Sequence, residues 1–135
     1  MKRFFAALFA ALLLTPVAWA RWVEIDSRVF RNEPILTQAS VSDAEKKTHD
    51  AILKGAEDRK WQVIQDTPTV LRLRVNVRNK HTVVVDVRIK PGKVDVDYVD
   101  SINMNYNKSQ GTIHPNYHVW IDRLLQSARI HADIN

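Results

Sequence analysis

Side chains that can do chemistry are concentrated between Ser101 and Trp120. The stretch SINMNYNKSQGTIHPNYHVW holds four asparagines, two histidines, two tyrosines and a tryptophan. Polar groups at this density are typical either of a ligand or catalytic site or of a corner of the fold that hydrogen-bonds to itself. Both interpretations stay open from the sequence. With the residue before the stretch, the candidate binding residues are Asp100, Ser101, Asn103, Tyr106, His114, Tyr117 and Trp120.

Asp100, Ser101 and His114 are the residue types of a nucleophilic triad, which raises the hypothesis of a hydrolase. Ser101 has no G-x-S-x-G surroundings, and no nearby pattern predicts an oxyanion hole. We therefore assign no catalytic residue. A small-ligand binder or hydrolase-like enzyme that uses this corner is kept as the alternative function.

His114 and His118 are four residues apart, a spacing that places two imidazoles on one helix face, and Asp122 follows at the same interval. Pro115, however, places His114 at the start of the helix, and the chain has no cysteine and no HExxH glutamate. We predict no metal site. With three glycines in the chain and no glycine-rich phosphate loop, we predict no cofactor either.

Charged residues alternate along the predicted strands. Asp95 and Asp97 face the same way, but among arginines, and a solvated charge ladder explains them better than glycosidase chemistry. A single-stranded nucleic-acid binder needs aromatic residues among its cations, and the exposed positions here offer acids and amides instead. We predict no nucleic-acid partner. The cations of this face are Arg72, Arg74, Arg78 and Arg88.

Residues 1–20 have the pattern of a secretory leader. Lys2 and Arg3 precede an apolar run over 4–14, which is too short for a membrane span of about 20 residues, and an Ala-Trp-Ala site ends at Ala20. We expect cleavage near Ala20, a mature chain that starts at Arg21, and a periplasmic or secreted location. The absence of cysteine excludes disulfides and a lipid on an N-terminal cysteine, and no other stretch is apolar enough to span a membrane.

The remaining residues predict one α+β domain over 42–135, after an irregular or partly extended lead-in over 21–41. A first helix is expected from an N-cap at Ser42 to about Arg59, and strands over 61–65, 70–78, 82–90 and 93–99. A last helix should begin at Pro115. The fold predicted is a four-stranded antiparallel meander with two helices packed on one face, in the order α-β-β-β-β-α. The helix stripes that cover the sheet are Ala44, Thr48, Ala51, Ile52, Gly55 and Ala56, then Tyr117, Trp120, Ile121, Leu124, Leu125 and Ala128.

The strand register can also be predicted. A two-residue turn at Pro91-Gly92 pairs Ile89 with Val94, Val87 with Val96 and Val85 with Tyr98, and sets Arg88 opposite Asp95. A three-residue loop at Asn79-Lys80-His81 would pair Val77 with Val83 and Arg74 with Asp86. Apolar positions then meet apolar positions and opposite charges meet across the strands.

The same residues carry a resemblance. Tyr98-x-Asp100-Ser101-x-Asn103-Met104-x-Tyr106, followed by Ile113-His114-x-x-Tyr117-x-x-Trp120-Ile121-x-x-Leu124, resembles an uncharacterised family of small exported proteins of Gram-negative bacteria, many of them lipoproteins. Ala51-Ile52-x-x-Gly55-Ala56-x-x-Arg59-x-Trp61 resembles the first helix and strand of that family. The resemblance covers roughly residues 34 to 125. It implies the helix and strand order given above and the seven candidate positions, but no activity.

We therefore expect a non-enzymatic domain that binds a protein or polymer of the cell envelope, with its oligomeric state left open. The formal charge of +5, part of it in the leader, permits an anionic polymer or acidic partner. A second docking surface is offered by Ile64, Val84 and Val99 on the outer sheet face. The compartment alone also raises an inhibitor of lysozyme as a weaker hypothesis.

Overall fold

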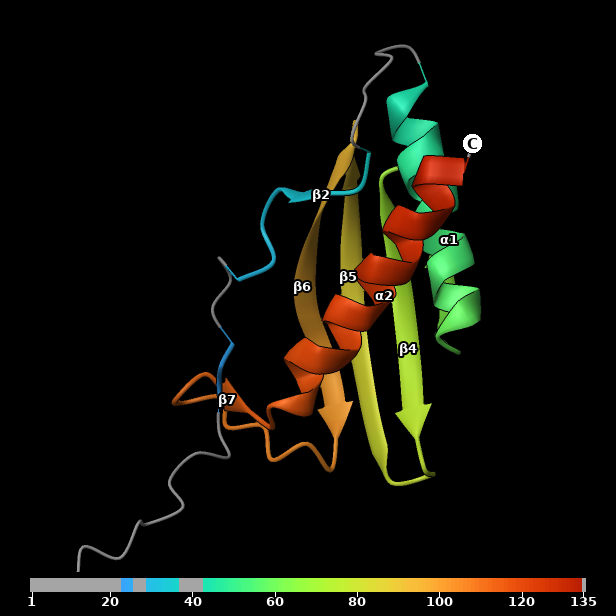
Figure 1. The fold of residues 1–135 in the computed structure, drawn as a ribbon. Helices are drawn as coiled ribbons and strands as arrows, with labels where there is room; N and C mark the ends of the chain where they lie inside the picture. Colours follow the sequence, from blue (N-terminus) through green and yellow to red (C-terminus); the bar gives the residue numbers. More distant parts are fainter. Residues whose placement is uncertain (1–22, 26–28, 37–42, 135) are drawn as a thin grey trace, which may run out of the picture.

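Two helices cover one face of an antiparallel sheet (Figure 1). The computed structural model describes residues 23–25, 29–36 and 43–134, so the predicted leader lies outside the described residues. The helices are α1 (Ala44–Asp58) and α2 (Asn116–Ile134). In the described part of the chain, neither helix is long and apolar enough to cross a membrane. The strands are β1 (Val23–Glu24), β2 (Glu33–Pro34), β3 (Gln62–Asp66), β4 (Val70–Val77), β5 (His81–Lys90), β6 (Lys93–Ile102) and β7 (Thr112–Ile113).

The α+β class, the two helices and the antiparallel sheet are confirmed, but the predicted count of four strands is wrong. Within the described residues the sheet has five strands in the order β2-β6-β5-β4-β3. The meander β3 to β6 is the predicted one, and β2 from the lead-in pairs with the edge of β6. A separate two-stranded pair joins β1 to β7. Strands therefore also precede α1 and follow β6, which the order α-β-β-β-β-α omitted.

The β5–β6 register is confirmed, because Ile89 pairs with Val94, Val87 with Val96 and Val85 with Tyr98. Gly92 has the positive φ of 75° that this tight turn requires, and its N–H donates to Thr48 Oγ1 on α1 at 3.0 Å.

The predicted β4–β5 register is wrong by two residues. Val77 pairs with His81, Val75 with Val83 and Arg72 with Asp86. Arg78 and Asn79 both adopt positive φ, 57° and 53°, and Lys80 N–H donates to the Val77 carbonyl. The loop still has three residues but begins one residue earlier, at Arg78, which moves the pairing by two residues. A shift by two residues leaves every side chain on its predicted face.

The core forms where the apolar face of the sheet meets both helices. Leu71, Leu73, Val83 and Val85 are fully buried against Ile52 of α1 and the α2 stripe. The predicted α1 stripe is buried throughout, and only Trp120 of the α2 stripe is half-exposed. Helix α1 begins after an N-cap at Asp43 that makes no side-chain capping bond; Ser42, the predicted cap, lies outside the described residues.

The described part of the lead-in covers the β6 edge. Phe30 and Ile35 belong to the core, and the Phe30 carbonyl accepts the Val96 N–H at 2.9 Å. Arg129 of α2 donates to the Pro34 carbonyl and to Glu33. The lead-in is thereby fastened to both the sheet and a helix.

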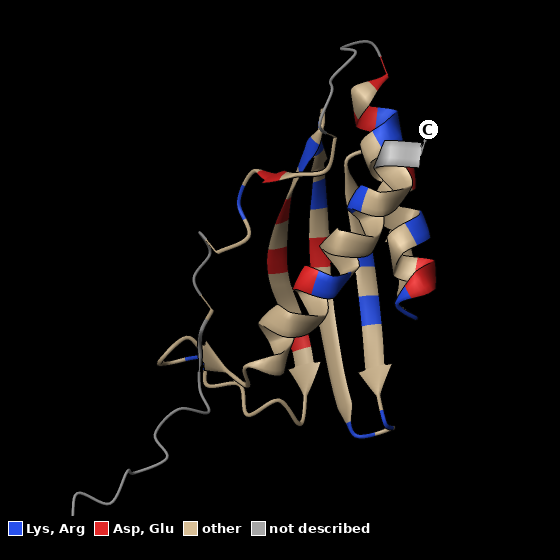
Figure 2. Ribbon diagram, in the orientation of Figure 1, with Lys and Arg blue, Asp and Glu red and all other residues tan. Residues whose placement is uncertain are grey.

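Ion pairs cross the outer face of the sheet, where acidic residues on β5 and β6 lie beside basic residues on neighbouring strands (Figure 2). Arg72 donates to both carboxylate oxygens of Asp86, at 2.8 and 3.0 Å. Asp95 was expected on a solvated face, but it is only 6% exposed, because Asn32 and Lys90 cover it. The sequence could not predict the part of this cover that Asn32 supplies, since it comes from the lead-in.

Candidate functional site

The predicted corner separates into small groups that bond mostly to themselves. Asp100 is exposed on the outer face, and its Oδ1 accepts the N–H of Ser101 at 2.8 Å. A bulge at Val84/Val85 turns Ser101 to the other face, where its hydroxyl bonds the Tyr98 hydroxyl at 2.7 Å. Asp100 and Ser101 therefore do not act on one substrate atom.

A second group lies where β5, β6 and α2 meet. Asn103, in a left-handed conformation, donates from its side-chain amide to the Lys80 carbonyl at 3.2 Å. Its own carbonyl lies 2.8 Å from Nδ1 of His81, so that nitrogen carries the proton. The His81 ring lies 6.4 Å from that of His114 and 6.3 Å from that of Trp120. His81 joins this group because of the β4–β5 register, which the sequence did not predict.

His114 accepts the Asn116 N–H at its Nδ1, at 3.1 Å, in the manner of a helix cap. Among the described residues His114 makes no contact with Asp100, whose carboxylate accepts the Ser101 N–H, and the Ser101 hydroxyl bonds Tyr98. The three residue types of a triad are thus not brought into a catalytic arrangement.

The tyrosines of the corner form an aromatic stack. Tyr106 stacks on Tyr98 with 4.3 Å between ring centroids, and Tyr117 tilts against Tyr98 at 5.9 Å. Burial raises the pKa of Tyr98 although its bond to Ser101 opposes the change, and burial also raises the pKa of Tyr117. Both phenols therefore stay protonated at physiological pH.

Trp120 also belongs to a pocket, which we call the tryptophan pocket. It has a volume of about 280 Å³. Val75 and Val77 of β4 line it together with two indoles and four charged residues. The full lining is Asp58, Arg59, Lys60, Trp61, Val75, Val77, Trp120 and Arg123.

The tryptophan pocket is positively charged. Three of its four charged residues are cations, and the carboxylate of Asp58 is engaged by Nε2 of His131. Arg59 is held by a bond from its Nε to the Ser127 hydroxyl at 3.1 Å. Among the described residues, Lys60 and Arg123 have no ion-pair partner.

The end of α1 positions these cations. The N–H of Lys60 donates to the Glu57 carbonyl and that of Trp61 to the Ala56 carbonyl, the paired bonds of a Schellman motif. Lys60 takes the left-handed position, with φ of 61°, where glycine is most favourable. The last carbonyls of α1 are thereby satisfied, which leaves fewer free acceptors to repel an anion near the pocket.

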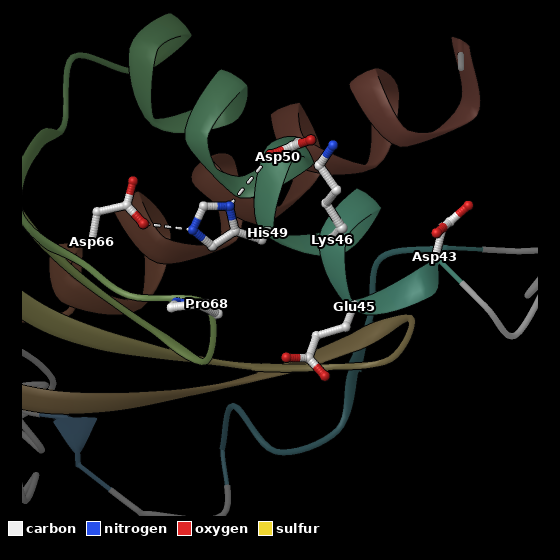
Figure 3. A pocket seen from close by; sticks show the side chains of 7 residues that line it. All are labelled: Asp43, Glu45, Lys46, His49, Asp50, Asp66 and Pro68. Atoms are coloured by element: carbon white, nitrogen blue, oxygen red, sulfur yellow. Dashed lines mark hydrogen bonds and ion pairs between the residues drawn. The ribbon is translucent and has the colours of Figure 1, made fainter.

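A larger pocket, of about 460 Å³, lies at the other end of α1 (Figure 3). His49 lies between Asp66, at 2.6 Å from its Nε2, and Asp50, at 3.4 Å from its Nδ1. The carboxylates of Asp43 and Glu45 lie apart from the imidazole (Figure 3). No group of ligands in the described residues could hold a metal ion. The His49–Asp66 contact links α1 to the end of β3.

The predicted docking surface on the outer face is not continuous. Ile64 is 51% exposed, whereas Val84 and Val99 are half-buried. Arg74 stands between β3 and Val84, because it pairs with Gln62 on one side and with Val84 on the other. These three apolar residues therefore do not form one patch.

Comparison of the chain with protein-family models, with curated proteins and with solved structures gives no match. Of the seven predicted site residues, Trp120 alone lines the tryptophan pocket. Sequence reasoning missed Lys60 and Arg123 as site residues, although Arg123 is three residues after Trp120 and so on the same helix face.

Proposed function

We propose that this protein is a non-enzymatic binding domain of the cell envelope that holds an anionic group in the tryptophan pocket. One observation carries the proposal: three cations and two indoles surround one small cavity whose single carboxylate is already engaged. A lining of cations, two indoles and two valines favours a ligand that is both apolar and anionic.

The size of the pocket restricts the ligand. Sites for whole small molecules or cofactors usually measure roughly 300–1,000 Å³, and this pocket lies just below that range. It suits one terminal group of a longer molecule. The rest of that molecule would lie outside, which fits the expected partners, an envelope protein or polymer.

The proposed location rests on the leader predicted over 1–20. Expression of the full chain in a Gram-negative host, followed by mass spectrometry of the exported product, tests it. A mature N-terminus at Arg21 in the periplasmic fraction is expected. Retention of the uncleaved chain in the cytoplasm contradicts the location but not the pocket.

The anion site is tested with phenylacetate and phenyl phosphate as small probes, and with phenethylamine as the cationic control. Binding is followed by the indole N–H signals of Trp61 and Trp120 in nitrogen-edited NMR spectra. We expect both anions to shift these signals at millimolar concentration and the amine to leave them unchanged. Arg123→Gln should weaken binding about five-fold, the size of effect for one exposed charge-assisted bond.

Lys54→Gln is the matched control, because Lys54 is an exposed cation on α1 outside the tryptophan pocket. It should leave the affinity unchanged. Indole signals that respond equally to the anions and to the amine, or that respond to neither, refute the proposed function.

A further inference from the structure

The tryptophan pocket lies beside an open stretch of strand edge. Strand β3 begins at Gln62, opposite Arg74 of β4, and the chain before it turns away into α1. Among the described residues, therefore, no strand pairs with Val75 to Val77 of β4 on that side. Val75 and Val77 form part of the pocket lining at this position.

Asn76 presents its main chain to the open side. The Thr69 and Val77 carbonyls accept bonds from the β5 side, whereas the Val70 carbonyl accepts one from Thr67, next to β3. Main-chain groups alternate in direction along a strand, so even-numbered residues of β4 point away from β5. The N–H and C=O of the exposed Asn76 therefore point to the vacant edge.

We propose that the ligand of the tryptophan pocket is the C-terminal end of an extended polypeptide, which continues the line of β3 along β4. This inference rests on the proposed function and names the chemistry of its ligand. The penultimate residue of the peptide exchanges two main-chain hydrogen bonds with Asn76, as in strand addition. The last residue lies opposite Val75, with its side chain on the pocket face.

Charge selects the direction of the peptide. A segment antiparallel to β4 runs the same way as β3, so its last residue arrives at Lys60 and Trp61, where β3 begins. The α-carboxylate then lies among the cations of the pocket. A parallel segment would bring an N-terminal ammonium to the same cations, which repel it.

The conformation of Lys60 agrees with this role. A lysine at a left-handed helix end is less favourable than glycine, and strain of this kind is often found at binding positions. It places at the pocket rim an ammonium that has no ion-pair partner among the described residues.

The test compares the full exported chain with four probes by calorimetry: the peptide acetyl-Ala-Ala-Ala-Phe with a free carboxylate, its C-terminal amide, the free acid with the penultimate amide N-methylated, and phenylacetate. We expect the free acid to bind about ten-fold more tightly than the amide, the usual effect of a charge-assisted bond. N-methylation should weaken binding about five-fold, because it removes one main-chain bond.

Lys60→Asn removes the charge with a residue that tolerates left-handed φ, and it should reduce the acid-to-amide ratio about three-fold. Lys54→Gln should leave the ratio unchanged. Equal affinities of acid and amide, or no effect of N-methylation, overturn the inference. If phenylacetate binds and no peptide binds, the inference is overturned but the proposed function stands. If neither phenylacetate nor any peptide binds, the inference and the proposed function are both refuted. Phenyl phosphate and vesicles with anionic headgroups are titrated in parallel with the four probes, and tighter binding of either one than of the peptide acid also overturns the inference.

Discussion

Gly55 is where the two helices approach each other most closely, and its replacement by alanine gives a sharp test of the packing. A Cβ at Gly55 would lie 2.8 Å from the Ala128 nitrogen, 3.0 Å from the Leu124 carbonyl oxygen and 3.1 Å from the Ala128 Cα. All three are main-chain atoms of α2. They cannot rotate away as a side chain can, so the whole helix must shift.

Two effects of opposite sign act on Gly55→Ala. Within a helix, alanine is more stable than glycine by about 1 kcal/mol. Overpacking of a well-packed core costs roughly 1–3 kcal/mol. The displaced backbone carries Leu124 and Ala128, both fully buried, which places the cost in the upper part of that range. We expect a net loss of about 1–2 kcal/mol in the free energy of unfolding.

Urea unfolding followed by far-UV circular dichroism measures this change. Lys54→Ala is the matched control on the exposed face of α1, and it should change stability by no more than about 0.5 kcal/mol. Ala128→Gly added to Gly55→Ala should give no rescue, because the contacts are with backbone. A Gly55→Ala protein that is more stable than the wild type by about 1 kcal/mol refutes the close approach of α1 and α2.

Three further predictions concern the lead-in, a half-buried histidine and the end of α1. Burial alone would raise the pKa of Asp95, but Lys90, the Asn32 N–H and Arg31 together lower it. Asp95→Asn should therefore lower the free energy of unfolding, measured in urea at pH 7, by about 1–3 kcal/mol. The exposed Asp100→Asn should lower it by no more than about 0.5 kcal/mol. The difference between wild type and Asp95→Asn should vanish as the pH falls below about 4, because the carboxylate of Asp95 is then protonated. Burial lowers the pKa of His118, whose Nδ1 has no partner among the described residues, although Asp122 opposes the shift. The unfolded chain then binds the proton more readily than the folded chain, so the free energy of unfolding should fall as the pH drops below about 6.5. His118→Phe should remove this fall. A variant with the same pH profile as the wild type would contradict the role of His118. Lys60→Gly should raise the melting temperature by relieving left-handed strain of about 0.5–1 kcal/mol while weakening anion binding, and a lower melting temperature would show that no strain is stored there.

The accuracy of the predicted registers depended on their turns. Pro91-Gly92 predicts a two-residue turn, because proline fixes φ at the first position and glycine supplies the positive φ at the second. The β5–β6 pairing derived from this turn was correct. In the β4–β5 turn Arg78 has a left-handed conformation, which an arginine in the sequence does not predict. The predicted β4–β5 pairing was therefore wrong by two residues. Alternation alone cannot detect an even shift, because every apolar residue stays on its face.

The candidate site was predicted in part. The density of polar groups correctly indicated a corner with many hydrogen bonds. There the Asn103 side chain bonds the Lys80 carbonyl in a turn, and His114 accepts the Asn116 N–H at the start of α2. The bulge at Val84/Val85 was not predictable, and it places Asp100 on the outer face and Ser101 on the core face, the reverse of plain alternation from Tyr98. The resemblance pattern included Arg59, Trp61 and Trp120, but no local signal showed that they line one pocket.

By itself the sequence determined the α+β class, the apolar face of the sheet and the two helix stripes, because these follow from side-chain periods of 2 and 3.6 that act within a few residues. Tertiary structure decided the fifth strand, the burial of Asp95 and the tryptophan pocket. Each of these joins segments separated by tens of residues: 32 to 95 for the carboxylate, and 59–61, 75–77 and 120–123 for the pocket. Such contacts depend on how the packed helices and strands meet in space, which no local pattern of residues encodes.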